Sequence, residues 1–407
     1  MATRTVWLSG FALACAGPAL PPAPTPAARF ETRPAGEHAP PLAPAPSEPD
    51  AAATKPPALF VAHPELSRAL PHVSLCALPT PVVESKSLAA RLGIRSLWVK
   101  RDDLASPVYG GGKARKLEWL LGEARRAEAT RIVTIGAAGS NQAVATAAFA
   151  SELGLSATLL LVPERPAEHV RRNLLASHAL GAELRAAHSM AAANALARRL
   201  LAEGSTYLIA PGGSTPLGNV AFVSAAYELK AQVDSGLLPP PDFIYLPLGT
   251  MGSAIGLLVG ALASGLPGRI IAVRVSSVPT STRAAAVALF DATVRFLRDA
   301  EPSFPLVRFD DARFEIEGRF LGAGYAAPTD SAKRAMTEYA AHLDHALEPV
   351  YTGKSFAALR VRAPLHPDAV HLFWNTHSSA APRGDGVDPA SLPRAFHAYF
   401  PRAGRTK

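Results

Sequence analysis

A lysine that follows three glycines is the first residue whose setting could support chemistry. Gly110, Gly111 and Gly112 stand directly before Lys113, where helical spacing of apolar residues begins. Glycines permit positive φ and close backbone approach, and a helix N-terminus favours an anionic neighbour. A partly desolvated lysine has a lowered pKa, which Schiff-base chemistry requires. Taken alone, this loop is explained at least as well by an ordinary surface lysine in a glycine-rich turn.

Two further glycine-rich loops each follow a predicted strand and precede a predicted helix. Residues 136–142 end in Ser140, Asn141 and Gln142, which can cap the helix or donate hydrogen bonds to a carboxylate. Residues 248–256 combine glycines with hydroxyls, a composition typical of a phosphate cradle built from backbone N–H groups. This loop matches neither the lysine-containing nucleotide triphosphate loop nor the dinucleotide pattern.

Two tyrosines stand in later loops. Tyr325 lies in the glycine-flanked stretch 322–325, and Tyr351 lies within residues 348–355. A tyrosine with a perturbed pKa can shuttle protons, although a tyrosine near Gly or Pro is more often simply packed. Neither stretch is decisive by itself.

Strands and helices alternate from about Leu59 onward, and this alternation must position the loops. A parallel crossover needs a dozen or more residues and usually uses a helix, so the pattern predicts an α/β architecture with parallel sheets covered by helices on both faces. Ligands bind beyond the carboxyl ends of such strands. The predicted strands are 97–100, 131–135, 157–162, 207–210, 243–248, 270–275 and 370–374, with helices at 113–127, 141–153 and 170–180.

The first 57 residues differ from the rest of the chain. Residues 1–15 combine Arg4, an apolar stretch and Cys15, which resembles a secretory or lipoprotein signal, although Ala12 stands where the lipoprotein pattern prefers leucine. Residues 16–57 are rich in Pro and Ala without apolar periodicity, which predicts a disordered tether. The two expectations are a periplasmic or membrane-anchored protein with a lipid on Cys15, and a cytoplasmic protein with an extension from a misassigned start codon.

Composition excludes several classes of protein. The chain has 407 residues, of which 48% are hydrophobic and 18% charged, as in folded globular proteins. Its net charge of +8 comes from dispersed Lys and Arg, so we expect no nucleic-acid partner. With only Cys15 and Cys76, and histidines that lack ligand spacing, the sequence predicts neither a disulfide framework nor a metal site.

Taken together and in order, the loops resemble the D-cysteine desulfhydrase and 1-aminocyclopropane-1-carboxylate deaminase family of tryptophan-synthase-β-like pyridoxal-phosphate enzymes. The resemblance covers about residues 78–376 and includes stretches 78–81, 100–104 and 212–218. It implies fold type II, with two open twisted parallel sheets and the cofactor between two domains. The catalytic region would span 58–407, with a smaller domain at about 120–215 and a larger one formed by the remainder. Family members usually form homodimers.

The same resemblance implies where pyridoxal 5'-phosphate binds. Lys113 would hold the cofactor as a Schiff base, with Gly112 in place of the family's asparagine. Lys116, the second lysine of the motif, would be a surface or packing residue. The expected phosphate cradle consists of Gly249, Thr250, Gly252 and Ser253.

The resemblance also assigns the substrate side of the site. Asn141 would lie beside the phenolic oxygen of the cofactor, and Ser140 and Gln142 would join it near the substrate carboxylate. Tyr325 and Tyr351 would lie near the substrate and, with Ser140 and the cofactor lysine, form the catalytic set.

Thr352 bears on the reaction, because the deaminase carries a glutamate at this position. A hydroxyl can only hydrogen-bond to the pyridine nitrogen, which leaves the ring a weaker electron sink. This difference favours a desulfhydrase-like α,β-elimination, in which a small amino acid such as D-cysteine gives pyruvate, ammonia and hydrogen sulfide. Residues 375–378 replace two glycines of the desulfhydrase pattern with larger side chains, so the pocket floor and the substrate are expected to differ.

Several alternatives remain open from the sequence. One group is other pyridoxal-phosphate activities of this fold: the deaminase, an amino-acid racemase or a different β-eliminating lyase. Another is an exported amino-acid-binding protein that has lost catalysis. A nicotinamide-dependent oxidoreductase would share the α/β alternation, but the chain lacks the dinucleotide fingerprint.

Overall fold

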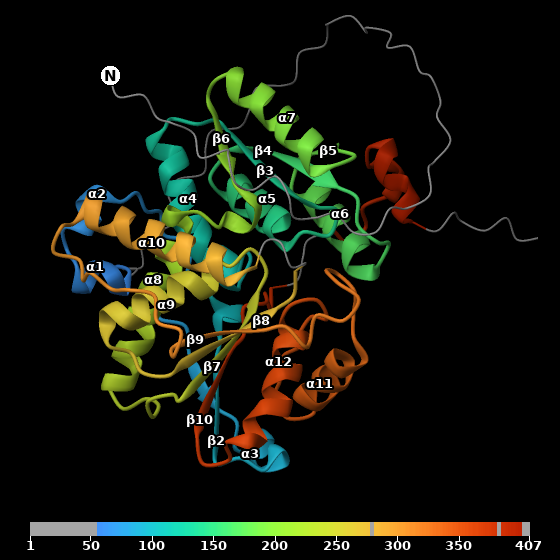
Figure 1. The fold of residues 1–407 in the computed structure, drawn as a ribbon. Helices are drawn as coiled ribbons and strands as arrows, with labels where there is room; N and C mark the ends of the chain where they lie inside the picture. The colour runs from blue at the N-terminus through green and yellow to red at the C-terminus, as the bar shows by residue number, and fades with distance from the viewer. Residues whose placement is uncertain (1–54, 277–280, 381–383, 401–407) are drawn as a thin grey trace, which may run out of the picture.

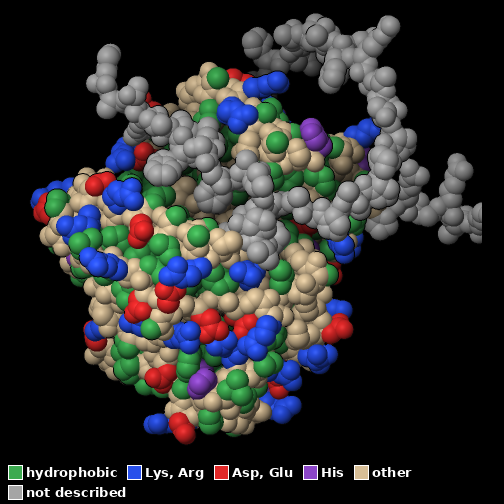
Figure 2. All heavy atoms as spheres, viewed as in Figure 1, with side chains coloured by type: hydrophobic (Ala, Val, Ile, Leu, Met, Phe, Trp, Pro, Cys, Tyr) green, Lys and Arg blue, Asp and Glu red, His purple; other side chains and the backbone are tan. Residues whose placement is uncertain are grey.

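The computed structural model describes residues 55–276, 281–380 and 384–400, which form two sheets in separate halves of the molecule (Figure 1). Cys15 and nearly all of the predicted tether lie outside the described residues. Within the described ranges, no helix is long and apolar enough to cross a membrane. On the face shown in Figure 2, Lys and Arg side chains are interspersed with Asp and Glu.

The larger sheet has six strands in the order β1-β2-β10-β7-β8-β9. Its strands β2, β10, β7, β8 and β9 are parallel, as predicted, but β1 pairs antiparallel with β2. The predicted open parallel sheet thus carries one antiparallel edge strand, β1, which has only three residues and gave no alternation in the sequence. The bounds are β1 (Val82–Glu84), β2 (Ser96–Lys100), β7 (Phe243–Leu248), β8 (Arg269–Arg274), β9 (Phe314–Glu317) and β10 (Val370–Trp374).

Helices cover both faces of this larger sheet. In β7 the side chains of Ile244 and Leu246 join the core beneath one group of helices, whereas Tyr245 faces the opposite group. The first group is α8 (Pro216–Asp234), α9 (Gly252–Ser264) and α10 (Arg283–Ala300), with the short α1 (Ala58–Ala62) and α2 (Leu66–Ala69) beside them. The second is α3 (Lys86–Leu92), α11 (Asp330–Ala340) and α12 (Thr352–Arg362).

The smaller sheet is entirely parallel, in the order β5-β4-β3-β6. Its strands are β3 (Arg131–Ala137), β4 (Ser156–Val162), β5 (Glu183–Ala186) and β6 (Thr206–Ile209). Alternate residues of β4 face opposite helices: Leu159 and Leu161 pack with α4 (Gly112–Arg126), α5 (Asn141–Glu152) and α6 (Glu168–Ala179), while Leu160 packs with α7 (Met190–Ala202). The predicted α/β fold of type II is thus confirmed. The smaller sheet lies within the range predicted for the smaller domain, whose boundaries remain a prediction.

Short 3₁₀ helices complete the described structure. They are η1 (Asp102–Leu104), η2 (Pro211–Gly213), η4 (Ala363–Leu365), η5 (Pro389–Ser391) and η6 (Arg394–Tyr399). Three of them matter for the site: η1 and η2 border loops that carry predicted site residues, and the Tyr399 hydroxyl at the end of η6 accepts a hydrogen bond of 3.0 Å from the backbone N–H of Glu164.

Candidate active site

The glycine loop before α4 packs tightly against the loop that follows β10. Gly111 has φ +84°, and a Cβ there would collide with the carbonyl oxygens of Thr376 and His377. The N–H of Gly112 donates to the Thr376 carbonyl at 3.1 Å. Only glycine fits this contact and this φ, so the glycine run fixes the start of α4 beside residues 375–378.

Lys113 occupies the second position of α4 and is held in a desolvated setting. Its side chain is partly accessible, and burial lowers the pKa of its amine to about 8. Among the described residues its Nζ makes no hydrogen bond or ion pair. An amine that is desolvated, unpaired and accessible is suited to attack a carbonyl carbon, as the predicted Schiff base requires.

The pKa of Lys113 leads to a prediction about cofactor loading. Only the neutral amine is a nucleophile, and its fraction rises as the pH passes upward through the pKa. Reconstitution of apo-protein with pyridoxal phosphate should therefore accelerate about tenfold between pH 7 and pH 9 and level off above that. Stopped-flow absorbance checks this, with the reaction of pyridoxal phosphate with a simple primary amine as the reference for the reagent's own pH dependence. A flat profile would contradict the assignment.

A buried ionic network anchors the first turn of α4. The guanidinium of Arg115 donates to Asp102 at 2.7 and 2.9 Å and to Glu228 at 2.9 Å, and Lys100 Nζ donates to Glu228 at 2.6 Å. Trp374 Nε1 also donates to Asp102, at 2.6 Å. Burial alone would raise the pKa of Glu228, but Arg115 and Lys100 lower it to about 2. Two cations and two anions thus fasten α4 to β2, β10 and α8.

The predicted phosphate cradle lies at the N-terminus of α9. Met251 precedes this helix with φ 67°, and the N–H of Gly252 donates to Ser214 Oγ at 3.2 Å. Ser214 Oγ is also 2.7 Å from Thr250 Oγ1. A Cβ on Gly252 would lie 2.5 Å from Ser214 Oγ and 2.8 Å from Lys116 Nζ. Hydroxyls, a helix N-terminus and a lysine amine therefore converge where the sequence predicted an anion.

Of the two expectations for Lys116, a surface or a packing residue, the structure rules out the surface position. Lys116 is 1% exposed, and its Nζ lies 3.1 Å from the Gly212 carbonyl and 3.3 Å from Ser214 Oγ. Burial, and next the positive charge of Lys113, lower its pKa. An ammonium in this position would need an anionic partner. The sequence did not indicate this role, because Lys116 meets Gly212 and Ser214 only through the packing of α4 against η2.

The three polar residues at the start of α5 point in different directions. Ser140 caps the helix, accepting from the Ala143 N–H at 3.3 Å. Asn141 lines the cavities described below, and its Oδ1 accepts from Asn173 Nδ2 at 3.0 Å. Gln142 is buried and would lie 3.6 Å from a Cβ on Gly213, next to the phosphate cradle. Their contacts with cofactor and substrate remain predictions.

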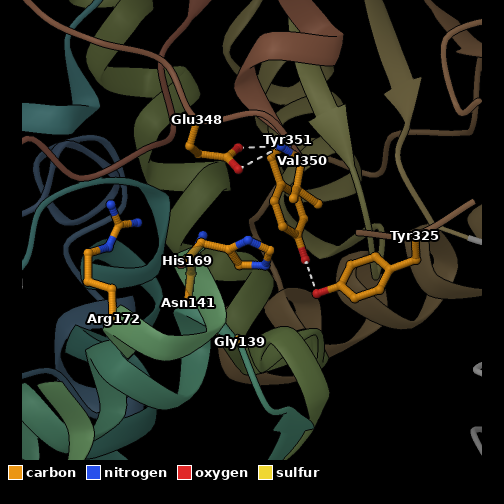
Figure 3. A pocket seen from close by; sticks show the side chains of 8 residues that line it. All are labelled: Gly139, Asn141, His169, Arg172, Tyr325, Glu348, Val350 and Tyr351. Carbon is orange, nitrogen blue, oxygen red and sulfur yellow. Dashed lines mark hydrogen bonds between the residues drawn. The ribbon is translucent and has the colours of Figure 1, made fainter. Parts of the chain in front are cut away.

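Tyr325 and Tyr351 come together in one cavity, although 26 residues separate them. The Tyr351 hydroxyl donates to Tyr325 at 3.0 Å, and the rings meet edge to face (Figure 3). A Cβ on Gly249 would lie 3.2 Å from the Tyr351 ring, so this tyrosine also borders the phosphate cradle. The cavity is lined by Gly139, Asn141, His169, Arg172, Tyr325, Glu348, Val350 and Tyr351.

Two residues without a predicted role hold the tyrosines in place. The carboxylate of Glu348 accepts hydrogen bonds of 2.6 to 2.8 Å from the backbone N–H groups of residues 350–352, at the start of α12. Lys354 Nζ donates to the carbonyls of Leu321 and Gly324, which precede Tyr325. The structure thus couples both tyrosine loops to one helix.

Thr352 is fully buried, and its hydroxyl accepts from the N–H of Glu348 at 2.9 Å. The hydroxyl is thus engaged by its own chain, and its contact with the pyridine nitrogen remains a prediction. The nearest carboxylate oxygen, Glu348 Oε1, lies 3.5 Å away. Thr352 is therefore an uncharged residue beside the Glu348 carboxylate, which already accepts hydrogen bonds from three backbone N–H groups.

Residues 375–378, where the sequence departs from the desulfhydrase pattern, contact the lysine loop. Ser378 Oγ accepts from the N–H of Gly110 at 2.9 Å, so this larger side chain fastens the loop. Asn375 is fully buried, and its Nδ2 has no hydrogen-bond partner among the described residues. His377 faces a second cavity that shares Asn141 with the first.

These residues fit pyridoxal phosphate. Two buried side-chain atoms, Gln142 Oε1 and Asn375 Nδ2, have no partner within the described chain, and buried polar atoms of this kind call for a ligand group. The cradle and Lys116 suit a phosphate, and Lys113 suits an aldehyde. When bound, the cofactor would supply an electron sink for the electron pair left at the substrate α-carbon.

Comparison with known proteins gives consistent matches. A family model described as pyridoxal-phosphate dependent enzyme matches residues 73–376. Nocardicin C-9' epimerase of Nocardia uniformis subsp. tsuyamanensis is 33% identical, covering 76% of this chain and 94% of the relative. D-cysteine desulfhydrase of Klebsiella pneumoniae is 32% identical, covering 71% and 87%. The crystal structure of an ACC deaminase homologue superposes with a TM-score of 0.69 at 26% identity, covering 80% of this chain and 96% of that one.

Proposed function

Because this chain belongs to the pyridoxal-phosphate-dependent enzyme family, within the group of D-cysteine desulfhydrases and ACC deaminases, we propose that it is a desulfhydrase-like lyase. The substrate would be a small amino acid, D-cysteine foremost. The observation that carries the proposal is Thr352, an uncharged residue directly after Tyr351. Without a carboxylate in place to hold the pyridine nitrogen protonated, loss of a β-thiol is favoured over opening of a cyclopropane ring.

The residues of this chain divide the reaction among them. The N-terminus of α5 orients the substrate carboxylate, and the cradle at α9 holds the cofactor phosphate. The neutral amine of Lys113 removes the α-proton. The Tyr351–Tyr325 pair, joined by its 3.0 Å hydrogen bond, donates a proton to the departing sulfur as the carbon–sulfur bond breaks. Water then completes the conversion of D-cysteine to pyruvate, ammonia and hydrogen sulfide.

A racemase or epimerase is the second candidate, and one observation favours it. His169 lines the tyrosine cavity from α6, with Nε2 held 2.9 Å from Glu164 Oε1 (Figure 3). A carboxylate that fixes one imidazole nitrogen leaves the other to exchange a proton. Racemisation needs proton-exchanging groups on both sides of the α-carbon. His169 and the two tyrosines line the same cavity from different elements, so they could act on opposite sides of a substrate. The relative named as an epimerase is consistent with this reading.

The two candidates predict different products from one experiment. Purified holoenzyme in deuterium oxide with D-cysteine should release sulfide and pyruvate in equal amounts if it is the lyase. With 1-aminocyclopropane-1-carboxylate it should form no 2-oxobutanoate. Deuterium incorporation at the α-carbon with recovery of both enantiomers, and without pyruvate, would replace the lyase by the racemase. Neither product nor exchange with a panel of amino acids would contradict both candidates.

A further inference from the structure

We propose that the cavity beside the Lys113 loop is a subsite for an anionic group on the substrate side chain, most simply a carboxylate. This inference rests on the proposed function only in taking an amino acid as the substrate. It names a class of substrate larger than D-cysteine, and it assigns specificity to Arg172, Tyr109 and His377.

The cavity adjoins the tyrosine cavity. Its volume is about 160 Å³, and Asn141 and Arg172 line both spaces. It is bounded on one side by α6 and on the other by the loops that carry residues 109 and 377–380. A group attached to a substrate held at Asn141 can therefore extend into it without leaving the site.

Three hydrogen-bond donors face this cavity without a protein partner. Arg172 stands at its solvent-exposed rim, His377 belongs to the loop that contacts Gly111, and Tyr109 is only 7% exposed. Among the described residues, none of these three side chains makes a hydrogen bond or an ion pair. Because Tyr109 lines the cavity, its hydroxyl can donate a hydrogen bond to an oxygen acceptor on a ligand bound there.

The charges around the cavity favour an anion. Burial raises the pKa of Tyr109 and lowers that of His377, so at neutral pH both are uncharged donors and Arg172 supplies the positive charge. Glu348 is the acidic group close enough to act on both Tyr109 and His377. Its carboxylate is already held by three backbone N–H groups and forms no ion pair with Arg172. The guanidinium is thus available to a ligand.

The size of the cavity argues for a longer side chain than that of cysteine. A cavity of about 150 Å³ accommodates a molecule of six heavy atoms, whereas the cysteine side chain has two. A side chain that ends in a carboxylate, with three or more heavy atoms before its terminal oxygens, would fill the space and reach Arg172.

Equilibrium binding of glutamate and glutamine tests the subsite, since these ligands match in shape and differ in charge. Both enantiomers of each are titrated against the holoenzyme and followed by cofactor absorbance. The wild type should bind one enantiomer of glutamate about tenfold or more tightly than the corresponding glutamine. Arg172→Gln should remove this preference. Arg171→Gln, on the same helix but outside both cavities, should preserve it.

Two outcomes would overturn the proposed subsite. Equal affinities for glutamate and glutamine in the wild type would mean that no anion is recognised there. Equal weakening of glutamate, glutamine and D-cysteine by Arg172→Gln would place the α-carboxylate at this arginine instead. The proposed lyase reaction fails separately: a glutamate preference without sulfide or pyruvate from D-cysteine would retain the subsite and reject only that reaction.

Discussion

Replacement of Lys113 by alanine is expected to reduce turnover by a factor of at least about 10³, because an interaction on which the chemistry depends is removed entirely. The variant should also lose the absorbance band of lysine-bound cofactor. Its stability should change by less than about 1 kcal/mol, since Nζ makes no hydrogen bond or ion pair within the described chain. Steady-state kinetics, the visible spectrum and thermal unfolding of the apo-protein check the three parts.

Two matched variants serve as controls for Lys113→Ala. Lys113→Arg keeps a positive charge but stays protonated and cannot form an imine, so it should be as inactive as the alanine variant. Lys86→Ala removes a lysine whose side chain is 84% exposed, and it should behave as wild type. Activity near the wild-type level in either Lys113 variant would refute the assignment of this lysine.

Replacement of Arg115 by alanine is expected to lower the free energy of unfolding by about 3–5 kcal/mol, the range for breaking one side of a buried ion pair. The loss leaves the carboxylates of Asp102 and Glu228 with only Lys100 as a nearby cation. Because Arg115 lies in the first turn of α4, the start of the helix should loosen and cofactor affinity should fall. Denaturant unfolding and cofactor titration measure the two effects.

The control for Arg115 lies ten residues further along the same helix. Arg125 is exposed and has no side-chain partner within the described residues, so Arg125→Ala should change the unfolding free energy by no more than about 0.5 kcal/mol. Similar losses for both variants would mean that helix propensity, and not the buried network, determines the effect. A small loss for Arg115→Ala would show that the network is not essential for the fold.

Local signals in the sequence were sufficient for the fold class and for the identity of the important loops. Strands such as 243–248 and 370–374 were predicted to the residue, because apolar runs bounded by turns reflect burial between helices on both faces. The strands β5 and β9 were not predicted, because their sequences ELRA and FEIE include charged residues and form no apolar run, whereas β6, equally short, reads TYLI. The resemblance then supplied residue roles within those loops, and those roles stay predictions.

The convergence of side chains within the site was decided by the tertiary structure. Lys116 turned out to be buried beside Ser214, 98 residues away, so its role depends on how α4 packs against η2. In the sequence, nothing distinguishes Arg172 from other polar residues of a surface helix. Its place in the cavity follows from the packing of α6 beside the Lys113 loop.

By itself, then, the sequence determined that this is an α/β protein with a glycine-delivered lysine, a helix-capping polar loop and an anion cradle. Each of these features depends on residues that are close together in the sequence. Backbone sterics, helix capping and apolar periodicity determine the local structure of such residues. The tertiary structure alone decided that Tyr109, Arg172 and His377 face one cavity, and that β1 runs antiparallel. Such contacts join segments tens to hundreds of residues apart, and the packing of whole elements, not local preference, brings them together.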